Sequence, residues 1–481
     1  ATTDEDTSVV IDVLANDSDP DGSDTLTVHS VDASGALGSV TNNGADVTYD
    51  PGAAFQYLAA GESARDVFTY VVTDGALTDT ARVTVTITGL NNGPVAADDT
   101  AATDEETPIT IDVLANDSDP DGSDTLTVHS VDASGALGSV TNNGADVTYD
   151  PGAAFQYLAA GESARDVFTY VVTDGALTDT ARVTVTITGL NNGPVAVDDT
   201  ATTDEDTSVV IDVLANDSDP DGSDTLTVHS VDASGALGSV TNNGADVTYD
   251  PGAAFQYLAA GESARDVFTY VVTDGALTDT ARVTVTITGL NNGPVAADDT
   301  AATDEETPIT IDVLANDSDP DGSDTLTVHS VDASGALGSV TNNGADVTYD
   351  PGAAFQYLAA GESARDVFTY VVTDGALTDT ARVTVTITGL NNGPVAVDDT
   401  ATTDEDTSVV IDVLANDSDP DGSDTLTVHS VDASGALGSV TNNGADVTYD
   451  PGAAFQYLAA GESARDVFTY VVTDGALTDT A

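Results

Sequence analysis

Four aspartates crowd the stretch LANDSDPDGSDTL, at Asp17, Asp19, Asp21 and Asp24, and no lysine or arginine lies among them. Carboxylates this close repel one another and raise one another's pKa unless a positive charge lies between them. The same thirteen letters return further along the chain, starting at Leu114, Leu214, Leu314 and Leu414. The loop therefore needs a counter-charge, and it needs one in every copy.

Two alternatives compete with a dedicated metal site. The spacing D-x-D-x-D-G matches the first half of an EF-hand loop, but the twelfth position of that loop should be Glu and is Val28 in this chain. A solvated acidic loop that serves only solubility or life in high salt is the second alternative. We expect instead a sandwich-type loop that is completed by ligands from elsewhere in the chain.

The composition is acidic throughout, with 83 Asp and Glu against 9 Lys and Arg and a net charge of −74. Without a basic patch the chain cannot bind nucleic acid through its phosphates or attach to an anionic membrane surface. Cysteine is absent, which excludes disulfides and thiolate metal sites. Hydrophobic residues make up 40% of the chain and alternate regularly, which indicates a folded chain rather than a disordered acidic one.

The sequence repeats with a period of 100 residues. This period is too long for most solenoid units and fits one sandwich domain per repeat. The linker Thr88–Ala96 is short, which favours stiff stacking of neighbouring repeats. We expect five domains, at 1–91 (lacking part of its first strand), 92–191, 192–291, 292–391 and 392–481 (lacking its last strand, so that a sheet edge is left unpaired).

Within a repeat the hydrophobic residues recur at every second position, which is the period of a β-strand. We predict no helical stretch and seven strands, at Pro94–Thr100 (an edge strand that opens the next repeat), Ser8–Leu14, Leu26–Val31, Gly38–Thr41, Ala45–Tyr49, Asp66–Val72 and Arg82–Thr88. The pattern indicates an all-β chain of tandem seven-stranded, immunoglobulin-like β-sandwiches that stack end to end as a rod.

This strand order decides where the acidic loops lie. Antiparallel succession places the loops after the second and sixth strands at one end of a repeat, and those after the first and fifth strands at the other. The first pair holds the aspartate loop and Asp174, while the second holds Glu5 and Glu62 of the preceding repeat. Asn91 and Asn92 lie in the linker between them. Oxygen ligands that converge in this number suit Ca²⁺, which takes six to eight at roughly 2.3–2.6 Å.

The predicted calcium ligands are carboxylates of these loops and asparagines of the linkers. In the loops that face the preceding repeat they are Asp17, Asp19, Asp21, Asp74, Asp117, Asp119, Asp121, Asp174, Asp217, Asp219, Asp221, Asp274, Asp317, Asp319, Asp321, Asp374, Asp417, Asp419, Asp421 and Asp474. At the opposite end and in the linkers they are Glu5, Glu62, Asp66, Glu105, Glu162, Asp166, Asn91, Asn92, Asn191, Asn192, Asn291 and Asn391.

The residues also resemble a known family. The stretch YDPGAAFQYLAAGESARDVFTYVVTDGALTDTARVTVTITGLNNGPVA closely resembles the VCBS repeat of giant bacterial surface proteins, and DDTAATDEETPITIDVLANDSDPDGSDTLTV resembles the related tandem cadherin-like repeats. The resemblance implies calcium-binding, Ig-like modules of RTX-type adhesins. It also implies export by type I secretion and display on the bacterial cell surface.

The resemblance extends to particular residues. Asp117 and Asp119 look like the D-x-D pair that follows the second strand in cadherins, and Asp174 before a glycine looks like a second ligand motif. Asn91-Asn92 resembles a weakened linker motif. Related repeats usually read N-D there, so Asn92 removes one carboxylate from this junction.

From these features we predict a calcium-stabilised extender that projects a distal adhesive domain, lying outside these residues, from a bacterial surface. Length is a property that near-identical copies improve, whereas catalysis gains nothing from them, so we do not predict an enzyme. The expected partners are calcium and the neighbouring repeats of the same chain, without membrane insertion. Calcium-dependent sugar binding, self-association, or an acidic surface-layer scaffold are the alternatives.

Overall fold

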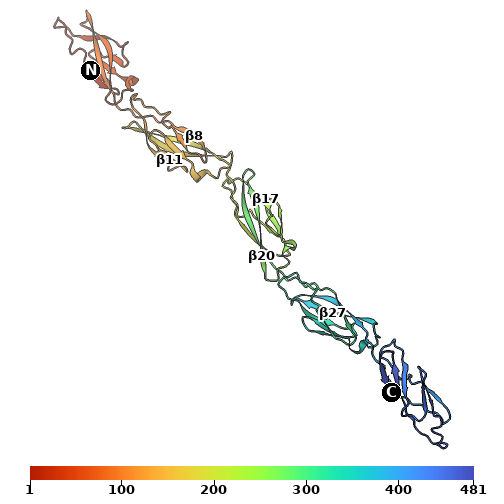
Figure 1. The fold of residues 1–481 in the computed structure, drawn as a ribbon. Helices are drawn as coiled ribbons and strands as arrows, with labels where there is room; N and C mark the ends of the chain where they lie inside the picture. The colour runs from red at the N-terminus through yellow and green to blue at the C-terminus, as the bar shows by residue number, and fades with distance from the viewer.

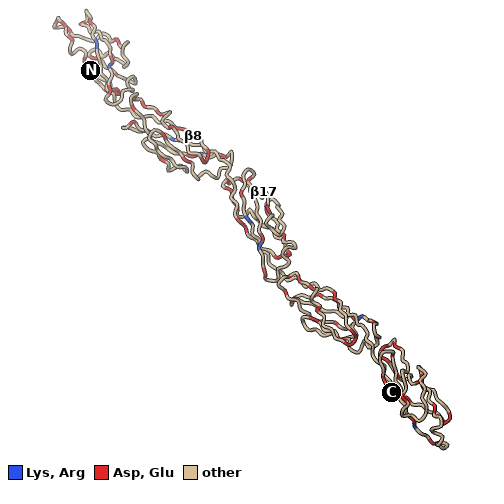
Figure 2. The backbone as a smooth tube through the Cα atoms, in the orientation of Figure 1, with Lys and Arg blue, Asp and Glu red and all other residues tan.

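A computed structural model describes all 481 residues as a line of β-sandwiches joined by short linkers. Figure 1 shows five such units in an extended rod, with the N-terminus within the unit at one end and the C-terminus within the unit at the other. The predicted fold class is confirmed, because each unit packs one four-stranded sheet against one three-stranded sheet in repeats one to four. Figure 2 shows that acidic residues are spread along the whole rod and that basic residues are sparse.

The second repeat shows the complete unit. Its strands are β8 (Asp99–Asp104), β9 (Ile109–Ile111), β10 (Thr127–Asp132), β11 (Ser139–Asn142), β12 (Val147–Asp150), β13 (Ser163–Thr173) and β14 (Thr178–Thr188). One sheet has the order β10-β13-β14-β8 and the other β11-β12-β9. All neighbours are antiparallel except β8, which pairs in parallel with β14, from Asp99 opposite Val183 to Asp104 opposite Thr188.

The other repeats use the same plan. Repeat one holds β1 (Thr2–Asp4), β2 (Val9–Ile11), β3 (Thr27–Asp32), β4 (Ser39–Asn42), β5 (Val47–Asp50), β6 (Ser63–Thr73) and β7 (Thr78–Thr88). Repeats three and four carry the equivalents of β8 to β14 as β15 to β21, within 199–288, and β22 to β28, within 299–388. Repeat five holds β29 (Val409–Ile411), β30 (Thr427–Asp432), β31 (Ser439–Asn442), β32 (Val447–Asp450), β33 (Thr469–Thr473) and β34 (Thr478–Thr480).

The core explains why the alternating pattern forms these sheets. In β13 and β14 every second side chain is buried, which places Phe168, Tyr170 and Val185 between the two sheets. A cluster of 14 buried residues fills repeat two, and the rings of Tyr149 and Phe168 stack across it at 6.1 Å. Burial of this apolar area is the main force that holds a sandwich together.

Two details differ from the predicted elements. The edge strand expected at Pro94–Thr100 begins only at Asp99, because Val95 instead forms a bridge to Ser118 and the linker lies across the end of the sandwich. The chain is also not free of helical turns. A short 3₁₀ helix spans Gly52–Phe55 and recurs in repeats two to four, and it places a buried Phe under the end of the core.

Candidate metal centre at the repeat junctions

The loop between β9 and β10 gathers three carboxylates at the end of repeat two that faces repeat one. Oxygen atoms of Asp119, Asp121 and Asp124 lie within 4.8 Å of one another. The loop is held in shape locally, because the backbone N–H of Asp121 donates to Oδ1 of Asp119 at 2.9 Å. The same group recurs in repeats three to five, while in repeat one it consists of Asp19, Asp24 and Asp74.

Glu5 reaches the junction from the opposite side, at the turn that follows β1. Its backbone N–H donates to the carbonyl of Thr88 at 3.1 Å, so the end of β7 fixes where the side chain starts. The side chain is only 1% exposed, and its Oε2 is buried without a hydrogen-bond partner. Glu105, Glu205 and Glu305 repeat this arrangement with 0% exposure. A buried carboxylate oxygen without a donor is costly unless a cation satisfies it.

Asn91 and Asn92 join the two sides. Nδ2 of Asn92 donates to Oε1 of Glu5 at 3.1 Å, and its backbone N–H donates to Oδ2 of Asp121 at 2.8 Å. Nδ2 of Asn91 donates to Oδ2 of Asp174 at 2.7 Å. The linker thus contacts the turn after β1 of one repeat and two loops of the next, so predicted carboxylates of both repeats lie close together at the junction.

The rest of the linker is seated between the same two loops. The backbone N–H of Ala96 donates to Oδ2 of Asp179 at 2.9 Å, and Gly93 lies against the side chain of Leu177. In repeat one, which has no preceding linker in this chain, the corresponding groove has a volume of about 520 Å³. A further backbone contact crosses the junction, from the N–H of Gly122 to the carbonyl of Tyr57 at 3.2 Å.

The electrostatics of the junction match this crowding of acids. Burial raises the pKa of Glu5, and the charge of Asp121 raises it further. Burial and the charges of Asp121 and Asp174 also raise the pKa of Asp119. The pKa of Asp124 is raised by burial and by like charges that include Glu62 of the preceding repeat. Carboxylates of both repeats therefore repel one another, and no basic side chain at the junction offsets this repulsion.

These residues fit a calcium ion. The donors are carboxylate and carbonyl oxygens, Glu105 and its copies present a buried oxygen without a partner, and Oδ2 of Asp119 is likewise buried and unpartnered. Ca²⁺ prefers such hard oxygen donors and tolerates irregular geometry. Glu5, Asp119, Asp121, Asp124 and their copies are the side chains best placed to hold it.

Not every predicted ligand reaches this cluster. Asp66 is a correction, because its carboxylate is buried inside its own domain and is already satisfied. It accepts hydrogen bonds from the N–H groups of Leu37, Gly38 and Val67 and from the hydroxyl of Tyr49. Asp166 has the same partners in repeat two. This carboxylate anchors the connection between the two sheets, so neither Asp66 nor Asp166 is available as a calcium ligand.

Asp117 lies apart from the triad and belongs to a second acidic group. It accepts hydrogen bonds from the hydroxyl of Tyr170 at 2.9 Å and from the N–H of Ala97 at 2.8 Å. Beside it, Asp99 carries a buried Oδ2 without a hydrogen-bond partner. Burial raises the pKa of Asp99 to about 6, and the charge of Asp117 contributes. In repeat one, Asp17 likewise accepts from the hydroxyl of Tyr70 at 2.9 Å, without counterparts of Ala97 and Asp99 in this chain.

The remaining predicted ligands take intermediate places. Asp174 is held by hydrogen bonds within its own turn. Burial raises the pKa of Asp174, but hydrogen bonds from the N–H groups of Ala176 and Leu177 and from Asn91 outweigh burial, so the pKa is lowered. Glu62 stays near the junction, with its Oε2 accepting from the N–H of Ala59 at 3.3 Å. The asparagines present amide hydrogens to carboxylates rather than the oxygens that the sequence led us to expect.

Sequence reasoning left out three groups that the structure brings to the junctions. Asp124 was seen in the aspartate loop but not selected, although its spacing from Asp121 places both on one turn, where the N–H of Asp124 donates to the carbonyl of Asp121. Glu205, Glu305, Asn292 and Asn392 follow from Glu5 and Asn92 by the repeat period alone. The backbone carbonyl of Gln56, which accepts from Asn92 at 3.0 Å, had no sequence signal.

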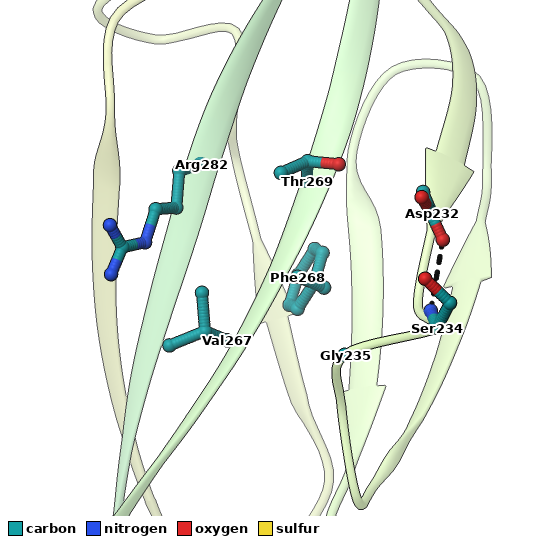
Figure 3. A pocket seen from close by; sticks show the side chains of 7 residues that line it. All are labelled: Asp232, Ser234, Gly235, Val267, Phe268, Thr269 and Arg282. Atoms are coloured by element: carbon teal, nitrogen blue, oxygen red, sulfur yellow. Dashed lines mark hydrogen bonds between the residues drawn. The ribbon is translucent and has the colours of Figure 1, made fainter.

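A hollow of about 330 Å³ on repeat three lies away from the junctions. Figure 3 shows it between Arg282 of β21 (Thr278–Thr288), Val267 to Thr269 of β20 (Ser263–Thr273) and the turn after β17 (Thr227–Asp232). The backbone N–H of Ser234 donates to Asp232 across its edge at 2.9 Å. Its lining has a single carboxylate, Asp232, and therefore no pair of acids.

Comparison with known families gives the same repeat unit. A family model described as a bacterial cadherin-like domain matches residues 1–89, 91–189, 191–289 and 291–389. The chain belongs to the bacterial cadherin-like domain family. Residues 391–481 match a second model, described as a bacterial Ig domain. No curated protein matches the chain.

The solved structures that resemble the chain include extracellular cadherin domains. The protocadherin GammaB4 extracellular domain is 15% identical, with 95% of this chain and 77% of that chain covered and a TM-score of 0.48. Cadherin domains 1–4 of protocadherin Gamma B7 are 16% identical, with 76% and 92% covered and a TM-score of 0.46. Drosophila N-cadherin EC1-4 is 13% identical, with 81% and 97% covered and a TM-score of 0.27.

These findings give the coarse functional class. Tandem bacterial cadherin-like and Ig domains are typical of extended surface or adhesion regions, and no enzyme family is indicated. No helix in the structure has both the length and the apolar character that crossing a membrane would require.

Proposed function

We propose that these repeats form a calcium-stabilised extender of a bacterial surface adhesin, with the domain units at 1–91, 92–191, 192–291, 292–391 and 392–481. The extender holds an adhesive domain, outside these residues, away from the cell. The VCBS resemblance of the sequence supports placing it in an RTX-type protein that is exported by type I secretion and serves attachment in biofilms.

The observation that carries this proposal is the meeting of carboxylates from two repeats at each junction. Glu105 of repeat two is fully buried with one oxygen unpartnered, and the charge of Asp221 of repeat three acts on it. A cation between such groups converts repulsion into attraction and fixes the angle between the repeats. Each sandwich adds roughly 40 Å at about 3.3 Å per strand residue, so five stiff repeats reach about 200 Å.

Calcium also connects stiffness to location. Extracellular modules commonly bind Ca²⁺ with dissociation constants of about 10⁻⁴ to 10⁻³ M. A junction in that range is empty of calcium in the cytosol and filled outside the cell. The repeats would then leave the cell as a looser chain and stiffen at the surface.

Small-angle X-ray scattering tests the proposal directly. The chain is measured in millimolar Ca²⁺ and in EGTA at equal ionic strength, and again in high NaCl without calcium. We expect a maximum dimension near the rod length in Ca²⁺ and a smaller one in EGTA. Equal curves in Ca²⁺ and EGTA would contradict the calcium role. Recovery of the rod by NaCl alone would favour an acidic scaffold that only needs screening.

A further inference from the structure

Asn92 places a neutral amide where two carboxylates of neighbouring repeats meet. Its Nδ2 lies 3.1 Å from Oε1 of Glu5 and 3.3 Å from Oδ1 of Asp121. The same nitrogen lies 3.0 Å from the carbonyl oxygen of Gln56. One side chain therefore joins two turns of repeat one, which hold Glu5 and Gln56, to the aspartate loop of repeat two.

The amide orientation follows from its surroundings. All three neighbours of Nδ2 are oxygen acceptors, and an amide oxygen turned toward them would meet only lone pairs. The backbone N–H of Asn92 adds a fourth hydrogen bond, to the other oxygen of Asp121 at 2.8 Å. The residue can thus act only as a donor to these groups as they are arranged here.

The same contact recurs at every junction. Nδ2 donates to the buried glutamate at 3.0 Å in each of the pairs Asn192–Glu105, Asn292–Glu205 and Asn392–Glu305. The carboxylates are nearly inaccessible, since Glu105 is 0% and Asp221 is 1% exposed. Hydrogen bonds to ionised groups are stronger than neutral ones, and more so where solvent is excluded.

A carboxylate in place of this amide would have two opposite effects. It would add a third negative charge beside Glu5 and Asp121, which strengthens calcium binding because affinity rises with ligand charge. It would also remove the donor and add repulsion whenever calcium is absent. The amide therefore lowers the calcium affinity of the junction, but its hydrogen bonds hold the two repeats together without a cation.

We propose that Asn92, Asn192, Asn292 and Asn392 form a calcium-independent clasp. The clasp keeps neighbouring repeats in line at calcium concentrations that do not saturate the carboxylates, and it lowers the calcium affinity of the junction. This inference rests on the proposed function only in taking the junction as the stiffening element, and it adds a contribution that calcium does not supply.

The test compares three four-fold variants of the full chain with the wild type. The first replaces the clasp by carboxylates (N92D, N192D, N292D, N392D), and the second replaces it by alanine at the same positions. The control is N43D, N143D, N243D and N343D, which adds the same charge in hairpin turns. Asn43 is a matched choice because its Nδ2 also donates to a carboxylate, that of Asp46 at 2.6 Å, but within one domain. Far-UV circular dichroism verifies that each variant is folded.

The readouts are the radius of gyration from scattering, with Ca²⁺ and with EGTA, and calcium binding by titration calorimetry. In EGTA we expect the radius of gyration of the Asp and Ala clasp variants to be smaller than that of the wild type by roughly a third, as for freely jointed units. The control should match the wild type. In Ca²⁺ the Asp variant should recover the rod and bind calcium about tenfold more tightly, whereas the Ala variant should not gain affinity.

The outcomes separate the clasp from the calcium proposal. Equal radii of wild type and both clasp variants in EGTA would overturn the clasp. The calcium role would stand if these radii were smaller than the radius of the wild type in Ca²⁺. A wild type that is equally extended with and without calcium, beside Asp and Ala variants that contract in EGTA, would uphold the clasp and remove calcium as the stiffening agent of the wild type. A control that contracts as much as the Asp variant would show that added charge alone is responsible, and would also overturn the clasp.

Discussion

Repeats three and five have the same sequence over 192–281 and 392–481, yet they differ in structure. Repeat three has a first strand, β15 (Asp199–Asp204), and a core cluster of 14 buried residues. In repeat five, residues 399–404 form no strand and the core cluster holds 5 buried residues. The difference is the missing partner. Strand β15 pairs with β21, whose counterpart in repeat five is cut to β34. Local sequence alone therefore does not complete this fold.

The two repeats also differ at the metal centre. Glu205 is fully buried because its backbone N–H donates to the carbonyl of Thr288, at the end of β21. Glu405 has no such partner and is only partly buried. The last strand of a repeat thus positions the carboxylate that its junction with the next repeat uses. Folding of the sandwich and assembly of the cation site depend on the same pair of strands.

Supplying the missing strand should have the largest effect. We expect that appending RVTVTITGL after Ala481 restores the first strand of repeat five and raises its stability by an amount on the order of 5 kcal/mol, because about nine more side chains become buried. In differential scanning calorimetry in EGTA, the extended chain should lack the low-temperature transition that we assign to the unfolding of repeat five. An appended scrambled sequence is the control, and persistence of that transition with the correct strand would contradict the pairing argument.

A substitution in each of the two repeats tests the role of the carboxylate that anchors the two sheets. Asp266 is 3% exposed and accepts from the hydroxyl of Tyr249 and from three N–H groups. We expect Asp266→Asn to lower the free energy of unfolding of repeat three by about 3 kcal/mol, since it leaves buried donors unsatisfied. Asp466→Asn, where the residue is only partly buried, should cost less, about 1 kcal/mol. Calorimetry of the two variants checks this, and equal losses would be against it.

Much of this could be predicted from the sequence. The period of two in the RVTVTIT stretch gives the strands, and the order of strands puts Glu5 and the aspartate loop at one junction. What could not be predicted are pairings that span the domain. The start of β8 at Asp99 depends on how Val95 and Ala96 are seated on another loop, and the satisfied state of Asp66 depends on N–H groups some 29 residues away. An acidic residue looks the same in sequence whether a cation or the backbone neutralises it.

Substitution of the junction glutamate should affect calcium binding in repeat three but not in repeat five. Glu205 faces the junction between repeats three and four, where Asn292 contacts it, whereas Glu405 faces no further repeat in this chain. We expect Glu205→Gln to weaken calcium binding at one junction by about tenfold, since one ligand charge is removed. Glu405→Gln should leave the titration unchanged. Calorimetric titration measures both, and an equal effect of the two substitutions would place the calcium sites elsewhere.

The smallest expected effect is a dependence on pH. Burial and the charge of Asp217 raise the pKa of Asp199 to about 6, from an ordinary value of 3.8. The folded repeat therefore binds a proton more tightly than the unfolded chain. Its contribution to stability is complete below about pH 4 and is lost as pH rises through 6. In EGTA, repeat three should melt somewhat higher at pH 5 than at pH 7.5.

Asp199→Asn should abolish that part of the pH dependence. In repeat five the pKa of Asp399 is raised less strongly, because its strand is not formed and it is less buried. Asp399→Asn should therefore change the pH profile less. A profile of repeat three that is unaffected by Asp199→Asn would assign the dependence to other carboxylates.

The parallel pairing of the first and last strands has a consequence for how the chain must fold. Asp104 meets Thr188 across 84 residues, so a repeat has a high contact order and cannot close until its final strand is present. An identical final strand lies about twice as far along the chain, and loop-closure entropy disfavours it by only about 0.6 kcal/mol. Neighbouring repeats can therefore exchange strands if they fold at the same time. Vectorial folding, in which one repeat closes before the next emerges, is the simplest way to keep each strand with its own partner.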